Sequence, residues 1–321
     1  MDGSPGPVPV AISHGVITAY HDPGFAAPLG DHVMPMRKFQ LVADALAGRA
    51  GIRVEAPSPV ATADLLRVHS SAYVEAVRSG EPRALAESQK FPWSPALWPS
   101  VLLTNGAAVA AAARALDDGV AAALASGFHH SHADHGEGFC TFNGLVVAAE
   151  ALRAAGRVDR VAVLDLDLHY GNGTASLCAT RPWLASCSIY GNDYWQNTPY
   201  RDVETVRHAD GPNHVSLALP NGSGRAILLA ALERGTARLL AIARPDLVLY
   251  QAGADPYRED PYSPLDLDHD DLRERDRFVF AWARREGLPL AWVLAGGYTP
   301  DVSKVVDVHV GTFDAAQSVY R

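Results

Sequence analysis

The sequence predicts an α/β fold in a single domain, with a central, mostly parallel sheet flanked by helices on both faces. Two observations predict it. Short apolar runs bounded by turn residues alternate along the chain with helical patterns, which is typical of the strand–helix–strand units of a parallel sheet. The 321 residues also contain no internal repeat, low-complexity linker or charge block that marks a second domain. We therefore expect one domain over residues 1–321.

The expected strands are short apolar runs without the alternation of a half-exposed strand, as buried parallel strands usually are. In chain order they cover residues 8–12, 120–124, 161–167, 184–189, 215–219, 246–251 and 290–294. The expected helices have apolar residues at a spacing of three or four, and cover residues 35–47, 62–77, 97–116, 143–155, 224–243 and 268–286. Loops are expected at residues 13–31, 56–61 and 91–99. The aromatic residues of the last loop form a binding rim or pack on the core.

Composition excludes several classes of function. The formal net charge of −9 argues against binding to a phosphate backbone. No apolar run approaches the roughly 20 residues needed to span a bilayer, and the N-terminus lacks the pattern of a secretory signal. Three cysteines without metal-type pairing favour a reducing compartment. We expect a cytoplasmic protein with neither a nucleic acid nor a membrane as partner.

The most informative motif is D-x-D-x-H, formed by Asp165, Asp167 and His169. It closes the apolar run 161–167, and side chains two positions apart in a strand share one face. A glycine-rich turn follows, so the motif lies at the carboxyl end of a strand, where open α/β sheets bind ligands. Two carboxylates and an imidazole on one face predict a divalent cation site. The alternative is a strand end whose acids face solvent or cap the next helix.

Three other expected strands are followed by polar residues. Residues 127–143 carry four histidines, of which His129 and His130 come first. Asp255 follows the strand 246–251, and Tyr298 follows paired glycines that let the backbone approach closely.

Together, Asp167, His169 and Asp255 provide three ligands for one cation and leave positions open for water and substrate, as a catalytic zinc site requires. Water bound to such a cation can attack a carbonyl near neutral pH, with His130 or His129 as the base. The same ligands also accept iron(II).

Each imidazole needs a partner on its other nitrogen. Asp165 and Asn172 lie beside the expected ligands and suit this role. Tyr298 is placed to donate its phenolic hydrogen to the oxyanion that forms as water adds.

Several motifs in order, G-F-H-H-x-H, G-F-C-x-F-N, D-L-D-L-H-x-G-N-G-T, Q-A-G-A-D and G-G-Y, resemble those of the zinc-dependent histone deacetylase superfamily, which shares its fold with arginase. The resemblance covers nearly the whole chain. The segment H-V-M-P-M-R-K-F and the run from R-P-D-L-V-L-Y-Q-A-G-A-D to A-G-G-Y resemble the class IV branch and its bacterial relatives. The resemblance implies one deacetylase-like catalytic domain over residues 1–321.

The resemblance also implies a role for each of these positions. It makes Asp167, His169 and Asp255 the zinc ligands. It pairs His129 with Asp165 and His130 with Asn172, gives the general base role to His130, and makes Tyr298 the residue that stabilises the transition state. Because Asn172 is neutral, His130 should keep the lower proton affinity of the two histidines. A structural potassium ion is implied as well, bound mostly through backbone carbonyls of Asp165, Asp167, His169, Ser188 and Ile189.

Substrate contacts are implied in the same way. Phe139, next to Gly138, matches one wall of a narrow acyl-lysine tunnel, and Tyr194 or Trp195 is expected to form the opposite wall. Tyr262 is expected at the tunnel mouth, where polyamine-specific relatives tend to carry an acid. Gly296 belongs to the motif that brings Tyr298 to the substrate.

The activity expected from these features is removal of an acyl group, acetyl or longer, from lysine side chains of a protein or peptide. Acetylpolyamines or other small acylated amines are the alternative substrates, and a non-catalytic ligand-binding protein of the same fold is a remote alternative. We expect His132, Asp134 and His135 to form a solvated loop or local hydrogen bonds. Cys140 is expected to be a small buried side chain.

Overall fold

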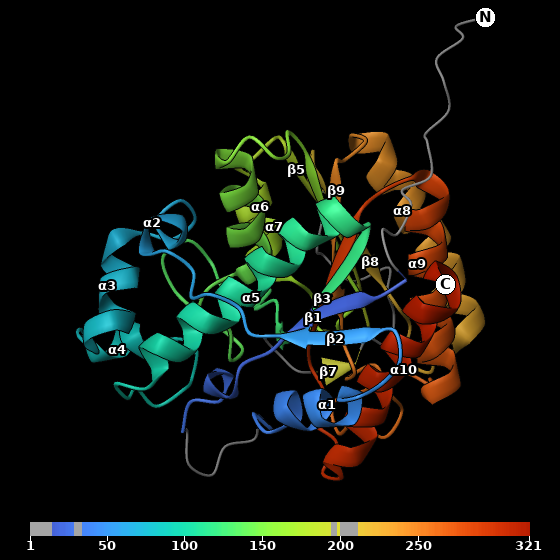
Figure 1. Cartoon of the computed structure of the whole chain (residues 1–321), viewed down its shortest axis with the longest axis horizontal. Coiled ribbons are helices and arrows are strands. Elements are labelled where there is room, and N and C mark those ends of the chain that lie inside the picture. Colours follow the sequence, from blue (N-terminus) through green and yellow to red (C-terminus); the bar gives the residue numbers. More distant parts are fainter. Residues whose placement is uncertain (1–14, 29–33, 194–197, 200–210) are drawn as a thin grey trace, which may run out of the picture.

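The computed structural model describes residues 15–28, 34–193, 198–199 and 211–321, and its centre is an eight-stranded sheet (Figure 1). The strand order is β2-β1-β3-β10-β9-β4-β5-β8, and every neighbouring pair is parallel. The bounds are β1 Ile17–Tyr20, β2 Ile52–Glu55, β3 Val120–Ser126, β4 Val161–Asp165, β5 Leu184–Tyr190, β8 His214–Ala218, β9 Leu247–Ala252 and β10 Leu290–Leu294. Two short strands, β6 Asn192–Asp193 and β7 Thr198–Pro199, form a separate antiparallel pair.

Helices cover the sheet in two groups (Figure 1). One group packs around α5 Leu97–Asp118 and includes α6 Gly144–Ala154 and α7 Asn172–Cys178. The other contains α1 Lys38–Leu46, α8 Arg225–Ile242, α9 His269–Glu286 and α10 Val302–Tyr320. The short helices η1 Pro23–Phe25, α2 Thr62–Leu65, α3 Ser71–Ser79 and α4 Arg83–Ala86 complete the described elements. The predicted parallel sheet between helices is confirmed.

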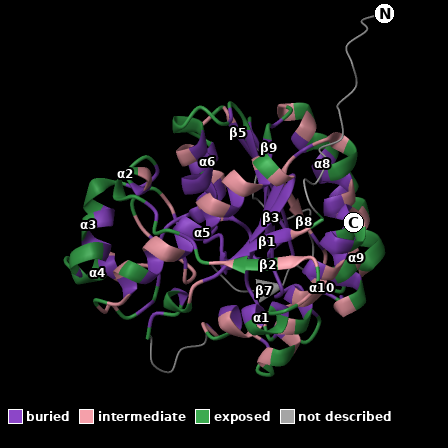
Figure 2. Cartoon of the chain, in the orientation of Figure 1, coloured by how far each residue is buried: buried purple, intermediate pink, exposed green. Residues whose placement is uncertain are grey.

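Burial explains why the central strands are mostly apolar on both faces. All residues of β3, β4, β9 and β10 are buried, whereas the edge strand β2 is partly exposed (Figure 2). Strands covered on both faces gain from apolar side chains at even and odd positions alike.

Several predicted boundaries were wrong. The expected loop 13–31 contains β1, whose four residues are too few for a clear pattern, and β2 and α10 were not predicted. The expected helix 62–77 is two helices, because the chain turns after Leu65 and Ser70 starts α3 by accepting a hydrogen bond from the Tyr73 amide. The expected strand 8–12 lies outside the described residues.

Two expectations from composition can be compared with the structure. Cys140, Cys178 and Cys187 are all buried, as expected for Cys140. Within the described parts of the chain, no helix combines the length and the apolarity needed to cross a membrane.

Candidate active site

Four neighbouring strands carry the candidate site at their carboxyl ends. The order β3-β10-β9-β4 places next to one another the four segments that sequence analysis selected. Residues 127–143 follow β3, Tyr298 follows β10, Asp255 follows β9 and the D-x-D-x-H motif follows β4.

The D-x-D-x-H motif leaves the sheet earlier than predicted. The strand β4 ends at Asp165, so Asp167 and His169 lie in the turn that follows it, and the expected strand 161–167 was two residues too long. In this turn the backbone amides donate hydrogen bonds to carboxylates instead of to the carbonyls of a neighbouring strand. The Asp167 amide donates to Asp165 Oδ1 (3.1 Å), the Leu168 amide to Asp255 Oδ1 (3.0 Å) and the His169 amide to Asp167 Oδ1 (3.0 Å). Hydrogen bonding to acids, rather than strand alternation, therefore aims these side chains at one point.

Asp167, His169 and Asp255 meet as a compact group of metal-ligand atoms. His169 Nδ1 lies 3.2 Å from Asp167 Oδ1 and 3.2 Å from Asp255 Oδ2, and all three residues are buried. Two ligands on a tetrahedral zinc ion with bonds of about 2.0–2.1 Å lie about 3.4 Å apart. A single Nδ1–H group on His169 cannot donate a good hydrogen bond to both carboxylates, whereas a cation between the three atoms can bind all of them. The donor set fits zinc.

Gly296 makes the close approach of these acids possible. Its amide donates to Asp167 Oδ2 at 2.8 Å, and a Cβ atom at this position would overlap the carboxylate of Asp255. The glycine predicted at this position therefore shapes the space around the candidate metal ligands.

His129 and His130 lie side by side, with ring centroids 4.0 Å apart and only 3% of each residue exposed. His129 Nδ1 donates to Asp165 Oδ2 and His130 Nδ1 donates to the amide oxygen of Asn172, both at 2.7 Å. Each histidine thus has the partner predicted for it. A Cβ on Gly173 would lie 2.5 Å from the carbonyl carbon of His130, so only glycine lets the start of α7 approach the pair.

The two partners give the histidines opposite proton affinities. Burial lowers the pKa of His129, but the carboxylates of Asp165 and Asp167 outweigh burial and raise the pKa to about 8. Burial and the neighbouring His129 and His169 hold the pKa of His130 well below its usual value. His130 is therefore the neutral member of the pair at neutral pH.

Tyr298 follows β10 and faces the metal-ligand group, with its ring centroid 6.4 Å from that of His169. Its backbone amide donates to Asp260 Oδ2 at 2.7 Å. Burial, and then the charge of Asp255, raise the pKa of the Tyr298 hydroxyl well above its ordinary value. The phenol therefore stays protonated and can donate a hydrogen bond.

Lys38 is a fully buried cation beside the tyrosine. Its Nζ atom donates to the Ala295 carbonyl at 2.6 Å and lies 5.8 Å from the centroid of the Tyr298 ring. Burial lowers the pKa of Lys38 to about 8, against the raising effect of Asp255, Asp167 and Asp260. Sequence analysis did not assign Lys38 to the site.

Aromatic rings surround the approach to Tyr298. The ring centroid of Tyr262 lies 5.3 Å from that of Tyr298, and the centroid of Phe139 lies 6.3 Å from it. Phe139 stacks on the buried ring of Phe91, and it has a φ of 65°, next to Gly138 with a φ of 49°. The 91–99 segment therefore packs partly on the core at Phe91. Tyr194 and Trp195 lie outside the described residues.

The positions proposed for potassium lie on adjacent strands. Asp165 of β4 is paired with Ser188 of β5, and Ile189 is buried next to it. The Ser188 hydroxyl also accepts a hydrogen bond from the Gly171 amide at 3.2 Å. A potassium ion at these residues stays a prediction.

Sequence reasoning missed Asp260 and Glu137, which hold the site together. Asp260 accepts hydrogen bonds from the amides of Tyr298 and Tyr262, and Glu137 accepts one from Asn172 Nδ2 at 2.7 Å. The position of Glu137 inside G-E-G-F-C was a usable signal, because it lies in the same loop as the histidines. Asp260 acts through contacts with backbone amides, which leave no pattern in the sequence.

Comparison with known proteins agrees with this geometry. The model of the histone deacetylase domain matches residues 32–313. An uncharacterized protein of Picosynechococcus sp. is 30% identical over 311 residues, which cover 95% of this chain and 100% of that protein. Acetylpolyamine amidohydrolase 1 of Pseudomonas aeruginosa is 34% identical over 186 residues, which cover 57% of this chain and 51% of that protein.

The crystal structure of the HDA15 HD domain shares the fold, with a TM-score of 0.77 and 21% identity over 93% of this chain and 90% of that chain. The sequence match over most of the chain and the shared fold lead to one conclusion. The chain belongs to the histone deacetylase domain family and is a hydrolytic deacetylase.

Proposed function

We propose that this protein removes acyl groups from lysine side chains in a zinc-dependent hydrolysis. One observation carries the proposal. The candidate metal ligands Asp167, His169 and Asp255 lie at one end of the sheet with a paired set of buried histidines and a tyrosine hydroxyl donor. These are the ligand, base and oxyanion-stabilising groups that hydrolysis of an amide needs.

Zinc held by Asp167, His169 and Asp255 would acidify a water molecule and polarise the amide carbonyl. Since Asn172 accepts the Nδ1 hydrogen of His130, the basic electron pair of that ring is on Nε2 and can take a proton from water. Tyr298 donates its hydroxyl hydrogen to the oxygen on which charge develops. As the C–N bond breaks, the proton held by His130 passes to the leaving amine. His129 lies next to this base, and the Asp165 carboxylate balances the positive charge of the protonated His129 ring.

The aromatic rings support a linear aliphatic amine as the substrate. Phe139, Tyr262 and Tyr298 lie within ring-contact distance of one another or of His169, which suits the apolar stem of a lysine. The two acids beside Tyr262 already have hydrogen-bond or ion-pair partners. Asp260 is 3% exposed and accepts backbone amides, and Glu259 pairs with Lys304. Neither carboxylate is placed to attract the second amine of a polyamine.

Acetylpolyamines are the second candidate substrate. The similarity to acetylpolyamine amidohydrolase 1 favours them, although that alignment spans only about half of the relative. Small acylated amines also fit the aromatic approach.

We also propose three further features of this protein. They are one catalytic domain over residues 1–321, a cytoplasmic location, and a structural potassium ion at Asp165, Asp167, His169, Ser188 and Ile189. Three buried cysteines without metal-type pairing support a reducing compartment. The net charge of −9 supports a partner other than nucleic acid.

A substrate panel tests the proposal. The zinc-loaded protein is assayed with acetyl-, octanoyl- and myristoyl-lysine peptides and with acetylpolyamines, next to the Tyr298→Phe variant. We expect the highest kcat/KM with an acyl-lysine peptide and a loss of about 10²–10³ in kcat for Tyr298→Phe. Higher kcat/KM with acetylpolyamines would assign the enzyme to the second class. Equal activity of the variant on every substrate would refute the role of Tyr298.

A further inference from the structure

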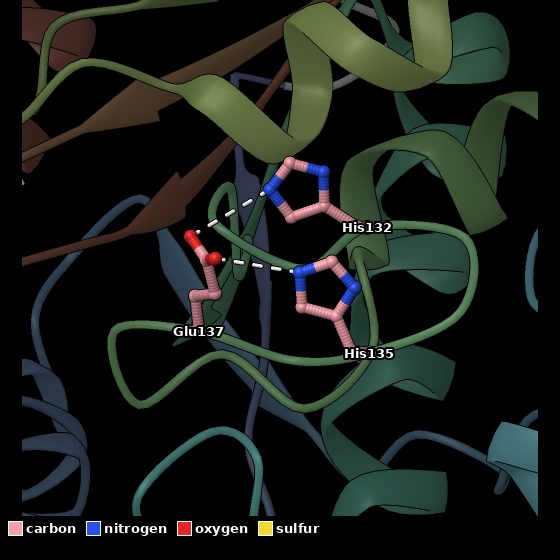
Figure 3. A group of neighbouring side chains, drawn as sticks. All are labelled: His132, His135 and Glu137. Atoms are coloured by element: carbon pink, nitrogen blue, oxygen red, sulfur yellow. Dashed lines mark hydrogen bonds and ion pairs between the residues drawn. The ribbon is translucent and has the colours of Figure 1, made fainter. Parts of the chain in front are cut away.

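A second group of metal-ligand side chains lies in the loop after β3. Its members are His132, His135 and Glu137, whose ligand atoms lie within 4.8 Å of one another (Figure 3). None of the three belongs to the Asp167, His169 and Asp255 group. Their side chains are 19%, 40% and 16% exposed, so an ion from solvent can reach them.

Hydrogen bonds fix which ring nitrogen of each histidine carries its hydrogen. His135 Nδ1 lies 2.7 Å from the Asp134 carboxylate, which only accepts, so Nδ1 donates. His132 Nδ1 lies 2.8 Å from the Ser176 hydroxyl, whose own hydrogen goes to the Gly173 carbonyl, so this Nδ1 donates as well. In the neutral rings, both Nε2 atoms therefore present electron pairs.

Both electron pairs point at Glu137. His135 Nε2 lies 3.3 Å from Glu137 Oε1, and His132 Nε2 lies 3.6 Å from Oε2 (Figure 3). Asn172 Nδ2 directs its hydrogens at Glu137 Oε2 (2.7 Å) and His132 Nε2 (3.2 Å), which relieves the repulsion on that side. Between His135 Nε2 and Oε1 two electron pairs face each other, and this arrangement favours a cation.

A metal ion bridges all three ligand atoms at once, whereas a proton on His135 Nε2 would serve only the contact with Glu137 Oε1. The rings of His132 and His135 are stacked, with centroids 4.6 Å apart and an interplanar angle of 7°. The separations of 3.3 and 3.6 Å match the roughly 3.4 Å between ligands of tetrahedral zinc. An oxygen acceptor on each Nδ1–H is also the usual support of a metal-binding histidine.

We infer that His132, His135 and Glu137 form a second binding site for a divalent transition-metal ion of the zinc class, with water in the remaining positions. Two imidazoles and one carboxylate suit Zn²⁺, Co²⁺, Ni²⁺ and Cu²⁺ and disfavour Mg²⁺ and Ca²⁺. The site lies beside the catalytic histidines, because Asn172 binds Glu137 through its nitrogen and His130 through its oxygen.

Metal stoichiometry tests the inference without an activity assay. After equilibrium dialysis against Zn²⁺, the wild-type chain should retain two ions, and His135→Ala and Asp255→Asn should each retain one. His269→Ala is the matched control, since His269 stacks on Tyr257 at the start of α9, and it should keep both ions. Circular dichroism confirms that each variant is folded.

A spectroscopic measurement isolates the second site. The Asp255→Asn protein and the Asp255→Asn/His135→Ala double variant are each loaded with Co²⁺. A visible absorption band of four-coordinate cobalt is expected in Asp255→Asn and should disappear in the double variant. If wild type and His135→Ala retain the same number of zinc ions, or if the cobalt band survives in the double variant, the second site does not exist.

Discussion

His130 Nδ1 lies 2.7 Å from the amide oxygen of Asn172, whereas the neighbouring His129 donates to a carboxylate at the same distance. Two histidines in contact therefore differ in the charge of their partners. Burial and the neighbouring His129 and His169 keep the pKa of His130 well below its usual value, and the neutral Asn172 brings no negative charge to offset them. The carboxylate of Asp165 helps to hold a proton on His129.

Exchanging the neutral partner for an acid should shift the pH profile. Asn172→Asp places a carboxylate at the Nδ1 hydrogen of His130 and raises the pKa of this ring. Because the base must be neutral, the acidic limb of the kcat/KM profile should move to higher pH by the same amount. The measurement is kcat/KM from pH 5 to pH 9.

A double variant controls for the new neighbour of the acid. Asn172→Asp alone brings two carboxylates together, since Asn172 Nδ2 donates to Glu137. The Asn172→Asp/Glu137→Gln variant restores a donor and acceptor at this contact. It should show the same shift of the acidic limb, and an unmoved limb in both variants would count against His130 as the base.

Adding one methyl group at Gly296 should weaken metal binding. A Cβ there would overlap the Asp255 carboxylate, so Gly296→Ala displaces a proposed ligand without removing it. We expect the zinc dissociation constant to rise at least tenfold, measured with a competing chelator. Gly311→Ala is the matched control, because nothing lies within 4 Å of a Cβ at that position in α10. Equal zinc affinity in both variants would be the contrary result.

Removing Asp276 should strongly destabilise the fold. This fully buried acid accepts Arg275 Nε at 2.8 Å and the Thr312 hydroxyl at 2.6 Å, and Tyr250 donates to it as well. Asp276→Ala leaves the buried Arg275 charge without its partner, at a cost of about 3–5 kcal/mol in the free energy of unfolding. Asp314→Ala removes the partly exposed acid that pairs with Arg49 and should cost at most about 1 kcal/mol. Urea denaturation of both variants measures the difference.

His69 should make the protein sensitive to acid. Its Nδ1 donates to the His132 carbonyl at 2.8 Å and its Nε2 accepts from the Asn143 amide at 3.1 Å, so the neutral ring is satisfied on both sides. A second proton would face the Asn143 N–H group. Burial is the main cause that lowers the pKa of His69, which falls to about 3.

The unfolded chain therefore binds this proton more readily than the folded chain between about pH 6.5 and pH 3. The stability that His69 contributes is complete above that range and is lost as the pH falls through it. From pH 7 to pH 5, the contribution falls by about 2 kcal/mol. The His69→Gln variant, which keeps an acceptor for Asn143, should lose less stability over this interval, as urea denaturation at both pH values would measure. Identical losses would contradict this role.

The sequence predicted the position of the site because its chemistry follows the strand pattern. Asp255 and Tyr298 each come directly after an apolar run, and parallel strands bring their carboxyl ends to one edge. The pairs His129 with Asp165 and His130 with Asn172 came from the family resemblance, and the hydrogen bonds agree with them.

Other features depend on contacts between residues far apart in the chain. Lys38 donates to Ala295, and no local pattern links these two positions. The strand β1 has four residues, and β2 includes two charged ones, so neither was visible as an apolar run. The early end of β4 depends on carboxylates accepting backbone amides, which alternation of residues does not reveal.

The most direct test of the central claim is the rate of acetate release from an acetyl-lysine peptide by metal-free protein as zinc is added. The account predicts no turnover without metal, recovery with zinc in the wild type, and no recovery in Asp255→Asn, because Asp255 is one of the three proposed ligands. Undiminished turnover by the metal-free protein, or full recovery of Asp255→Asn, would contradict a metal-dependent hydrolysis at this site.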